Sequence, residues 1–317
     1  MTTLPIVAEP SLIEEAVLRR IAGHSAERPF RRERDRLYLI TNEAKREQTF
    51  QQFHQRWFAQ LELGGPIDAA LGELPILAQT CVRCFVTRAA LPSDEGADLL
   101  VASDGSICER TVLIRLRVVS FDDPVALLTL LRFELLHVAD MADAAFGYEP
   151  TLPSVDGGPS YERLLRDRYR ALWNVSIAGR LHRRGVASPD AKAVAHRGFV
   201  AAFPGLGDAE ADETFEHFFD STTCSHADLV AFALTPHARG AARGLVAGGR
   251  CPLCRFSTYT PEPAPEDLPN EVVACIAQDF ADWQPTDGLC RQCADLYRAR
   301  PMSIAAAERL PNAHNTV

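Results

Sequence analysis

The sequence has no apolar stretch long enough to cross a membrane. A transmembrane helix needs about 20 consecutive, predominantly apolar residues, and charged side chains make up 24% of the 317 residues and interrupt the hydrophobic stretches. The first twenty residues also lack the basic segment and the apolar segment that open a secretory signal. These absences predict a cytoplasmic protein with no membrane among its partners.

The sequence has fewer basic than acidic side chains. Lysine and arginine together number 33 against 42 aspartates and glutamates, so the formal net charge is −9. An acidic chain does not attract the phosphates of nucleic acid through its overall field. The arginine-rich stretch 27–36 also contains Glu27, Glu33 and Asp35, and we interpret it as a solvated segment. The composition therefore argues against nucleic acid as a partner.

Two motifs of common enzyme classes are missing. The sequence contains no G-x-S-x-G, the strand-turn-helix motif that presents the nucleophile of α/β-hydrolases. The glycine-rich stretch 244–249 lacks the Lys-Ser/Thr pair of a phosphate-binding loop. These absences exclude both classes as they are defined by their motifs.

Helical patterns dominate what is present. Phe50, Phe53 and Trp57 recur at helical spacing within 42–62. Asp123 and Pro124 form a capping start for a long helix over 123–144. Further helices are expected over 12–22, 160–184, 189–204, 269–280 and 294–300.

One segment has the pattern of strands. Val112, Ile114 and Leu116 alternate with other side chains in 111–119, which indicates a half-buried strand, and the wider segment 75–121 is interpreted as strands and turns. The predicted fold class is α+β, mainly helical. The predicted domains are an N-terminal helical region (1–75), an α+β body (76–240), a four-cysteine zinc module (241–305) and a flexible tail (306–317).

Cysteines provide the strongest chemical signal. Nine are present, and Cys251-Pro252-Leu253-Cys254 and Cys290-Arg291-Gln292-Cys293 are two C-x-x-C pairs. Each such turn presents two thiolates to one ion, and two turns complete a tetrahedral zinc site. We therefore expect one structural Zn²⁺ per chain. The alternative is four unrelated buried or redox-active cysteines. Cys275, inside a helical pattern, is interpreted as an ordinary core cysteine.

The second pair lies between Gly288 and the predicted helix 294–300. A C-x-x-C turn followed by a C-x-x-C at a helix start resembles a treble-clef zinc finger over about 251–300. The resemblance implies a structural site, because four protein ligands leave no open position on the metal.

A second motif lies in the predicted helix 123–144. Phe133-Glu134-Leu135-Leu136-His137 resembles the H-E-x-x-H of zincin metallopeptidases, in which two histidines bind zinc and the glutamate activates the metal-bound water. The resemblance covers roughly 105–185 and implies a zincin-like body with a small antiparallel sheet. Residue by residue, it carries over Glu134 as general base and His137 as ligand. Phe133 replaces the first histidine and cannot bind metal.

Two functions follow from these motifs. The first is a non-catalytic zinc-binding protein, a degenerate zincin-like fold that acts through contacts with an unidentified protein partner. The alternative is an active metal-dependent hydrolase, a peptidase, in which Asp140 and neighbouring carboxylates complete an unorthodox ligand set around Glu134 and His137. A third interpretation of Glu134, His137 and Asp140 is a hydrogen-bonded cluster with Arg132 or an arginine of helix 160–184.

A further C-x-x-C, Cys81-Val82-Arg83-Cys84, is followed by Cys108. We interpret these cysteines as reduced and partly buried. The alternatives are a second zinc site and a redox pair.

Overall fold

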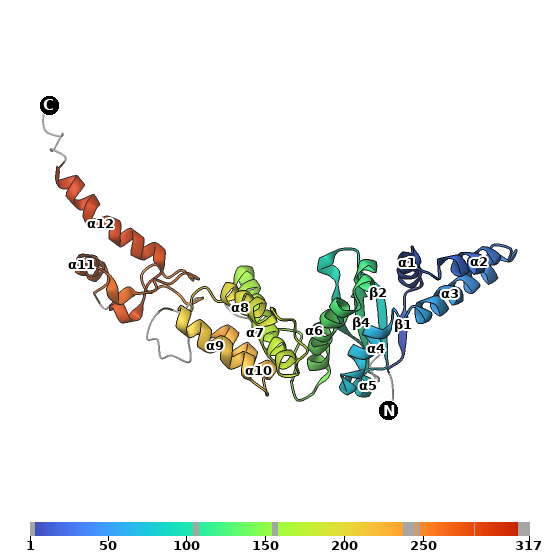
Figure 1. The fold of residues 1–317 in the computed structure, drawn as a ribbon. Coiled ribbons are helices and arrows are strands. Elements are labelled where there is room, and N and C mark those ends of the chain that lie inside the picture. The colour runs from blue at the N-terminus through green and yellow to red at the C-terminus, as the bar shows by residue number, and fades with distance from the viewer. Residues whose placement is uncertain are drawn as a thin grey trace. The chain divides into compact units, whose positions relative to one another are not determined.

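The computed structural model describes residues 4–103, 108–153, 158–236, 245, 248–281 and 283–309. These residues form an α+β structure that is mainly helical, as the sequence predicts. The chain divides into two compact units (Figure 1). The first comprises Met1–Pro150, Ser176–Lys192 and Ser221–His226, and the second comprises Thr151–Val175, Ala193–Asp220 and Ala227–Val317.

The first unit contains a four-stranded sheet in the order β1-β2-β4-β3. Its strands are β1 (Ile6–Ala8), β2 (Arg83–Arg88), β3 (Gly96–Ser103) and β4 (Cys108–Leu116). The pairs β1–β2 and β2–β4 are parallel, and only β3–β4 is antiparallel. The sheet is therefore mixed, where the zincin resemblance implied an antiparallel one. The alternation in β4 reports which face is buried but carries no information on strand direction.

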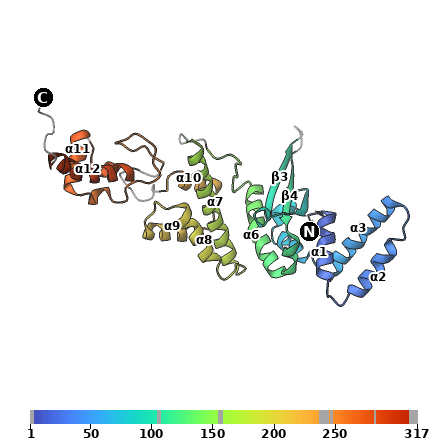
Figure 2. The ribbon, with the colours of Figure 1, turned by 90° about the horizontal axis from the view of Figure 1, so that it is seen from above.

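The first unit also contains six complete helices among the described residues. They are α1 (Pro10–Ile21), α2 (Glu27–Leu37), α3 (Glu43–Gln60), α4 (Gly65–Gly72), α5 (Pro75–Thr80) and α6 (Pro124–Ala142). Helix α6 packs against strand β3 and helix α4, beside the sheet in Figure 2. It begins where the sequence predicts, because the Asp123 side chain accepts hydrogen bonds from the backbone N–H groups of Val125 and Ala126.

The stretch that we interpreted as solvated, 27–36, is helix α2. Most of its charged side chains are exposed or half-buried, but Phe30 is almost fully buried. The Phe30 ring lies 4.9 Å from that of Phe53 and 5.3 Å from that of Trp57, both on α3. One buried aromatic side chain therefore holds a helix whose other residues are mostly charged.

The second unit is built from helices and the cysteine-rich segment. Its helices are α8 (Ala191–Ala202), α9 (Asp208–Asp220), α10 (His226–Leu234), α11 (Asn270–Asp279), α12 (Arg291–Arg309) and the first part of α7 (Gly158–Arg183), whose residues from Ser176 onward belong to the first unit. Phenylalanines fill much of the core of α8, α9 and α10, among them Phe199, Phe203, Phe215 and Phe219.

Some predictions concern residues outside the described ones. The predicted boundary at 240 and most of the predicted tail 306–317 lie there. Within the described residues, no helix combines the length and the apolar character that a membrane span requires.

Candidate metal centre

A short hairpin presents the first cysteine pair. Arg250 and Ser257 form an antiparallel bridge, and the backbone N–H of Cys251 donates to the carbonyl of Phe256 at 3.0 Å. Arg255 closes the turn with a φ of 64°, and its N–H donates to the Cys251 carbonyl at 2.8 Å. A positive φ is uncommon for a residue other than glycine, and the hydrogen bond closes the turn that contains both cysteines.

The start of helix α12 presents the second pair. Cys290 immediately precedes the helix and Cys293 lies in its first turn. Cys290 also pairs with Pro261 in an isolated antiparallel bridge. Gly288, with a φ of 71°, makes the turn before it, and a Cβ there would lie 2.5 Å from the backbone nitrogen of Leu245. Only glycine fits this turn without displacing the chain beside it.

The four sulfur atoms converge. All lie within 4.8 Å of one another, and the Cys251–Cys293 and Cys254–Cys290 pairs are each 3.9 Å apart. A tetrahedron with zinc–sulfur bonds of 2.3 Å has sulfur–sulfur edges of about 3.8 Å. The cysteines are free thiols, not disulfides. Their spacing fits a single tetrahedral metal ion.

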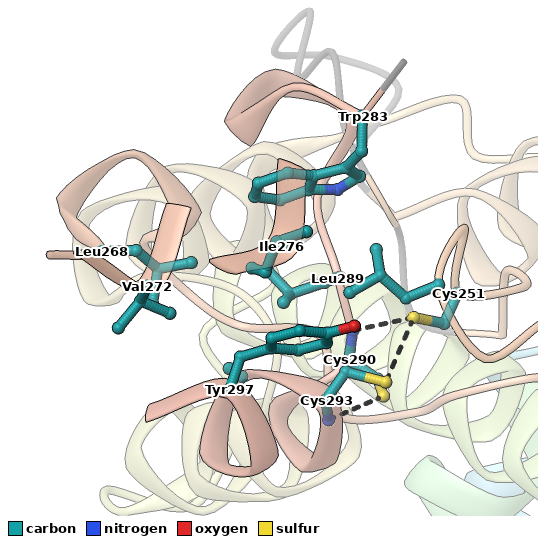
Figure 3. Packing of buried hydrophobic residues seen from close by; sticks show 11 residues of the cluster. Cys251, Leu268, Val272, Ile276, Trp283, Leu289, Cys290, Cys293 and Tyr297 are labelled. Atoms are coloured by element: carbon teal, nitrogen blue, oxygen red, sulfur yellow. Dashed lines mark hydrogen bonds between the residues drawn. The ribbon is translucent and has the colours of Figure 1, made fainter. Parts of the chain in front are cut away.

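Backbone N–H groups point at two of these sulfurs. The N–H of Cys290 lies 3.4 Å from Sγ of Cys251, and the N–H of Cys293 lies 3.4 Å from Sγ of Cys290 (Figure 3). Burial tends to raise the pKa of Cys251, but hydrogen bonds from backbone N–H groups, including that of Cys290, lower it to about 7. Burial and the neighbouring sulfurs raise the pKa of Cys293. The set therefore needs a cation before all four thiols ionise.

A compact apolar core surrounds the cysteines (Figure 3). The indole N–H of Trp283 donates to the Gly288 carbonyl at 3.0 Å, and the Tyr297 hydroxyl donates to Asp279 at 2.7 Å. Cys275 packs against this core without joining the sulfur cluster, which confirms its interpretation as a core cysteine. The core comprises Leu253, Leu268, Val272, Ile276, Trp283, Leu289, Ala294 and Tyr297 with Cys251, Cys290 and Cys293.

The degenerate motif lies on α6, where the sequence predicts a helix. Nδ1 of His137 lies 3.2 Å from the Phe133 carbonyl, and the two rings meet edge to face with centroids 5.2 Å apart. Glu134 points at strand β3: its Oε2 lies 3.0 Å from the position a Cβ on Gly96 would take. Among the described residues, the four cysteines are the one group of three or more side chains placed to hold a metal ion.

Asp140 is bound by an arginine. Its two carboxylate oxygens accept hydrogen bonds from Nη1 and Nη2 of Arg180 at 2.8 and 2.5 Å. An arginine of helix 160–184 was one of the partners expected for a hydrogen-bonded cluster, and this pair confirms that part of the interpretation. The sequence did not single out Arg180 from the other arginines of α7, because nothing local marks which of them faces α6.

The other C-x-x-C turn is buried in the first unit. Cys81 ends α5 and Cys84 points into the core from β2, and both are free thiols. Burial raises the pKa of both thiols, that of Cys84 to about 12. The raised pKa values keep both thiols neutral at physiological pH, and both side chains are buried, where we expected partly buried ones. The side chain of Cys108 lies outside the described part of the chain.

No family model, no curated protein and no solved structure matches this chain. The zincin and treble-clef resemblances therefore rest on the residues described above.

Proposed function

We propose that this protein is a non-catalytic zinc-binding protein, and that Cys251, Cys254, Cys290 and Cys293 hold one structural Zn²⁺. The observation that carries the proposal is the convergence of four thiols at tetrahedral spacing. The hairpin that carries the first pair and the helix start that carries the second are the two elements that the treble-clef resemblance implies. Bound there, zinc would link them and stabilise the module.

The body of the chain supports a non-catalytic role. Catalytic zinc has three protein ligands and one open position, whereas Phe133 occupies the position of the first histidine. Asp140, the nearest candidate for a replacement ligand, is engaged by Arg180. Displacing that arginine would leave its charge without this partner. The hydrolase alternative requires such a rearrangement around Glu134 and His137.

We place the activity in contacts with another protein. Phe256, which pairs with Cys251 in the first cysteine hairpin, is 76% exposed, and Leu296 on α12 is 67% exposed. An exposed aromatic side chain beside the metal site offers apolar area that a protein partner could cover. The free, buried thiols of Cys81 and Cys84 support a reducing compartment, the cytoplasm.

Elemental analysis of the purified full chain tests the zinc site. We expect one zinc per chain in the wild type and none in Cys254→Ser, because three remaining thiolates in an apolar core do not complete the site. Cys275→Ser is the matched control, since this cysteine packs on the same core outside the sulfur cluster. Unchanged zinc content in Cys254→Ser would remove the proposal.

The hydrolase alternative has its own test. Zinc content and cleavage of a mixed peptide library are measured for the wild type, His137→Ala and Glu134→Gln. We expect the same zinc content in all three and no cleavage by any of them. A second zinc lost in His137→Ala, with cleavage lost in Glu134→Gln, would establish the hydrolase instead.

Site-specific photocrosslinking tests the contact. A photoreactive amino acid replaces Phe256 in one protein and Val125, which is 74% exposed in the first unit, in another. We expect a discrete adduct from position 256 only, and its loss when Cys254→Ser is added. Equal adducts at both positions, or an adduct insensitive to Cys254→Ser, would contradict a contact made by the zinc module.

A further inference from the structure

Arg168 is a buried cation in the second unit. Its residue is 3% exposed, and it lies on α7 between Leu165 and Leu172, on the apolar side of the helix. A guanidinium stays charged in proteins and carries five N–H donors. One of these reaches the Ala233 carbonyl at 3.4 Å, and the Phe203 ring lies 5.5 Å from the guanidinium carbon. No carboxylate of the described residues pairs with it.

The Ala233 carbonyl belongs to the last turn of α10, so Arg168 partly caps that helix. This contact uses one donor of five and supplies only the partial charge of a carbonyl. Nε of Arg168 is fully buried and has no hydrogen-bond partner. A charge removed from water without a counter-ion is strongly disfavoured. The helix cap alone therefore does not account for a guanidinium at this position.

Tyr259 carries a second buried donor without a hydrogen-bond partner. The Tyr259 hydroxyl is buried and has no hydrogen-bond partner, and its ring stacks on that of Tyr161 with centroids 5.6 Å apart. Burial raises the pKa of Tyr259, and the positive charge of Arg168 acts in the opposite direction. Tyr161 and Arg168 are seven positions apart on α7, which is about two helical turns, so they lie on the same side of this helix, and Tyr259 stacks on Tyr161.

Gly248 lets the segment that carries Tyr259 approach Tyr161 closely. Its φ is 90°, and a Cβ at this position would lie 2.4 Å from Cε2 of Tyr161. The glycine thus permits the close approach that stacks Tyr259, eleven positions further along the chain, on Tyr161. The two tyrosines are held by packing and are not a chance surface pair.

We propose that Arg168 and Tyr259 bind an oxyanion, the phosphate or carboxylate group of a small molecule. Both unsatisfied groups are N–H or O–H donors, so the ligand that completes them must offer acceptor oxygens. Its negative charge would also supply the counter-ion that Arg168 lacks. Phosphate and carboxylate both match the planar fork of a guanidinium. This site is separate from the four cysteines and does not depend on the zinc proposal.

Isothermal titration of the zinc-loaded full chain tests the site. Inorganic phosphate and acetate are titrated separately at constant ionic strength, with chloride as the baseline anion. We expect saturable binding of at least one oxyanion, and the arm that binds identifies the chemical class. Tyr259→Phe keeps the stacked ring and removes one hydrogen bond to a charged group, so its Kd should rise about tenfold. Tyr38→Phe, an exposed tyrosine in the first unit, should bind as the wild type does.

Arg168→Met should abolish binding. In the absence of added oxyanion it should melt at or above the wild-type temperature, because it replaces an uncompensated buried charge with an apolar side chain of similar length. The proposal is overturned if the wild type binds neither oxyanion saturably, or if Tyr259→Phe binds with unchanged Kd. If Arg168→Met does not fold, the comparison of Tyr259→Phe with Tyr38→Phe decides.

Discussion

Asp140 and Arg180 form a two-point ion pair in which each carboxylate oxygen accepts from a different guanidinium nitrogen. The pair joins α6, which carries the degenerate zincin motif, to the end of α7. The Asp140 side chain is 8% exposed and that of Arg180 is 26% exposed. An aspartate held in this way serves as a structural anchor in the first unit.

Asp140→Asn should therefore destabilise the first unit without changing zinc content. Removing one partner of a fully buried pair costs about 3–5 kcal/mol, and the partial exposure of Arg180 reduces our expectation to about 2 kcal/mol. Urea unfolding measures the loss. Asp122→Asn, which breaks the exposed pair with Arg19, is the control and should cost less than about 1 kcal/mol. Equal losses in the two variants would show that burial does not strengthen the Asp140 pair.

Glu95 should make stability depend on pH. Its side chain is 9% exposed and accepts hydrogen bonds from Ser120 and from the backbone and side chain of Arg117. Burial tends to raise the pKa of this carboxyl, but the hydrogen bonds and the Arg117 charge outweigh it and lower the pKa. The stabilisation is therefore complete above the unfolded-state pKa of about 4.3 and is lost as the pH falls through the folded-state pKa.

The measurement is urea unfolding of the wild type and Glu95→Gln between pH 7 and pH 3. The variant should be less stable by about 1–2 kcal/mol at pH 7, and the difference should shrink in acid. Glu109→Gln is the control, because Glu109 is half exposed and lies 3.5 Å from Arg83. A stability difference for Glu95→Gln that stays constant across this range would contradict the assignment.

Gly288→Ala should weaken zinc binding. An alanine there would combine a left-handed backbone with a Cβ 2.5 Å from the Leu245 nitrogen, and strain of this kind costs about 1–3 kcal/mol. Because the strained turn leads directly into Cys290, a loss of about 2 kcal/mol would raise the zinc Kd about 30-fold. Chelator competition measures it. Gly198→Ala, where no atom lies within 4 Å of the new methyl group, should leave the Kd unchanged.

Thiol labelling should separate the cysteines into classes. Cys81 and Cys84 are buried and their raised pKa values keep them protonated at neutral pH, so iodoacetamide should leave them unmodified in the native chain. Half-buried Cys224 should react faster. Removing zinc should add the four cysteines of the module to the reactive set. Peptide mass spectrometry measures the extent of labelling at each cysteine. Detection of a Cys81–Cys84 disulfide would show that this pair is redox-active instead.

The features that the sequence predicted are those with local signals. Asp123 and Pro124 mark the start of α6 because a cap and a first-turn proline act on their own neighbours. The two C-x-x-C turns were recognisable because each is a complete two-ligand unit in four residues. The structure bears out their convergence.

The features that sequence reasoning missed depend on distant partners. Strand β1 is three residues long and forms only by parallel pairing with β2, in the register Ile6–Cys84. Helix α2 is held by Phe30, whose ring packs against Phe53 and Trp57 on α3. Arg168 is notable only because no carboxylate among the described residues pairs with it. Such properties arise from packing across the chain, and a single sequence does not display them.

The thiols of Cys254 and Cys290 are 36 positions apart in the sequence, so a metal held between the two pairs would act as a removable cross-link. By the chain-entropy relation for a closed loop of this length, such a link disfavours the unfolded chain by about 4 kcal/mol. In an oxidising compartment, a disulfide would keep such a loop closed whether or not metal is present. Here closure would instead follow the free zinc concentration and be reversed by protons, which compete for the same sulfurs. The C-terminal module would then be ordered or disordered by metal supply.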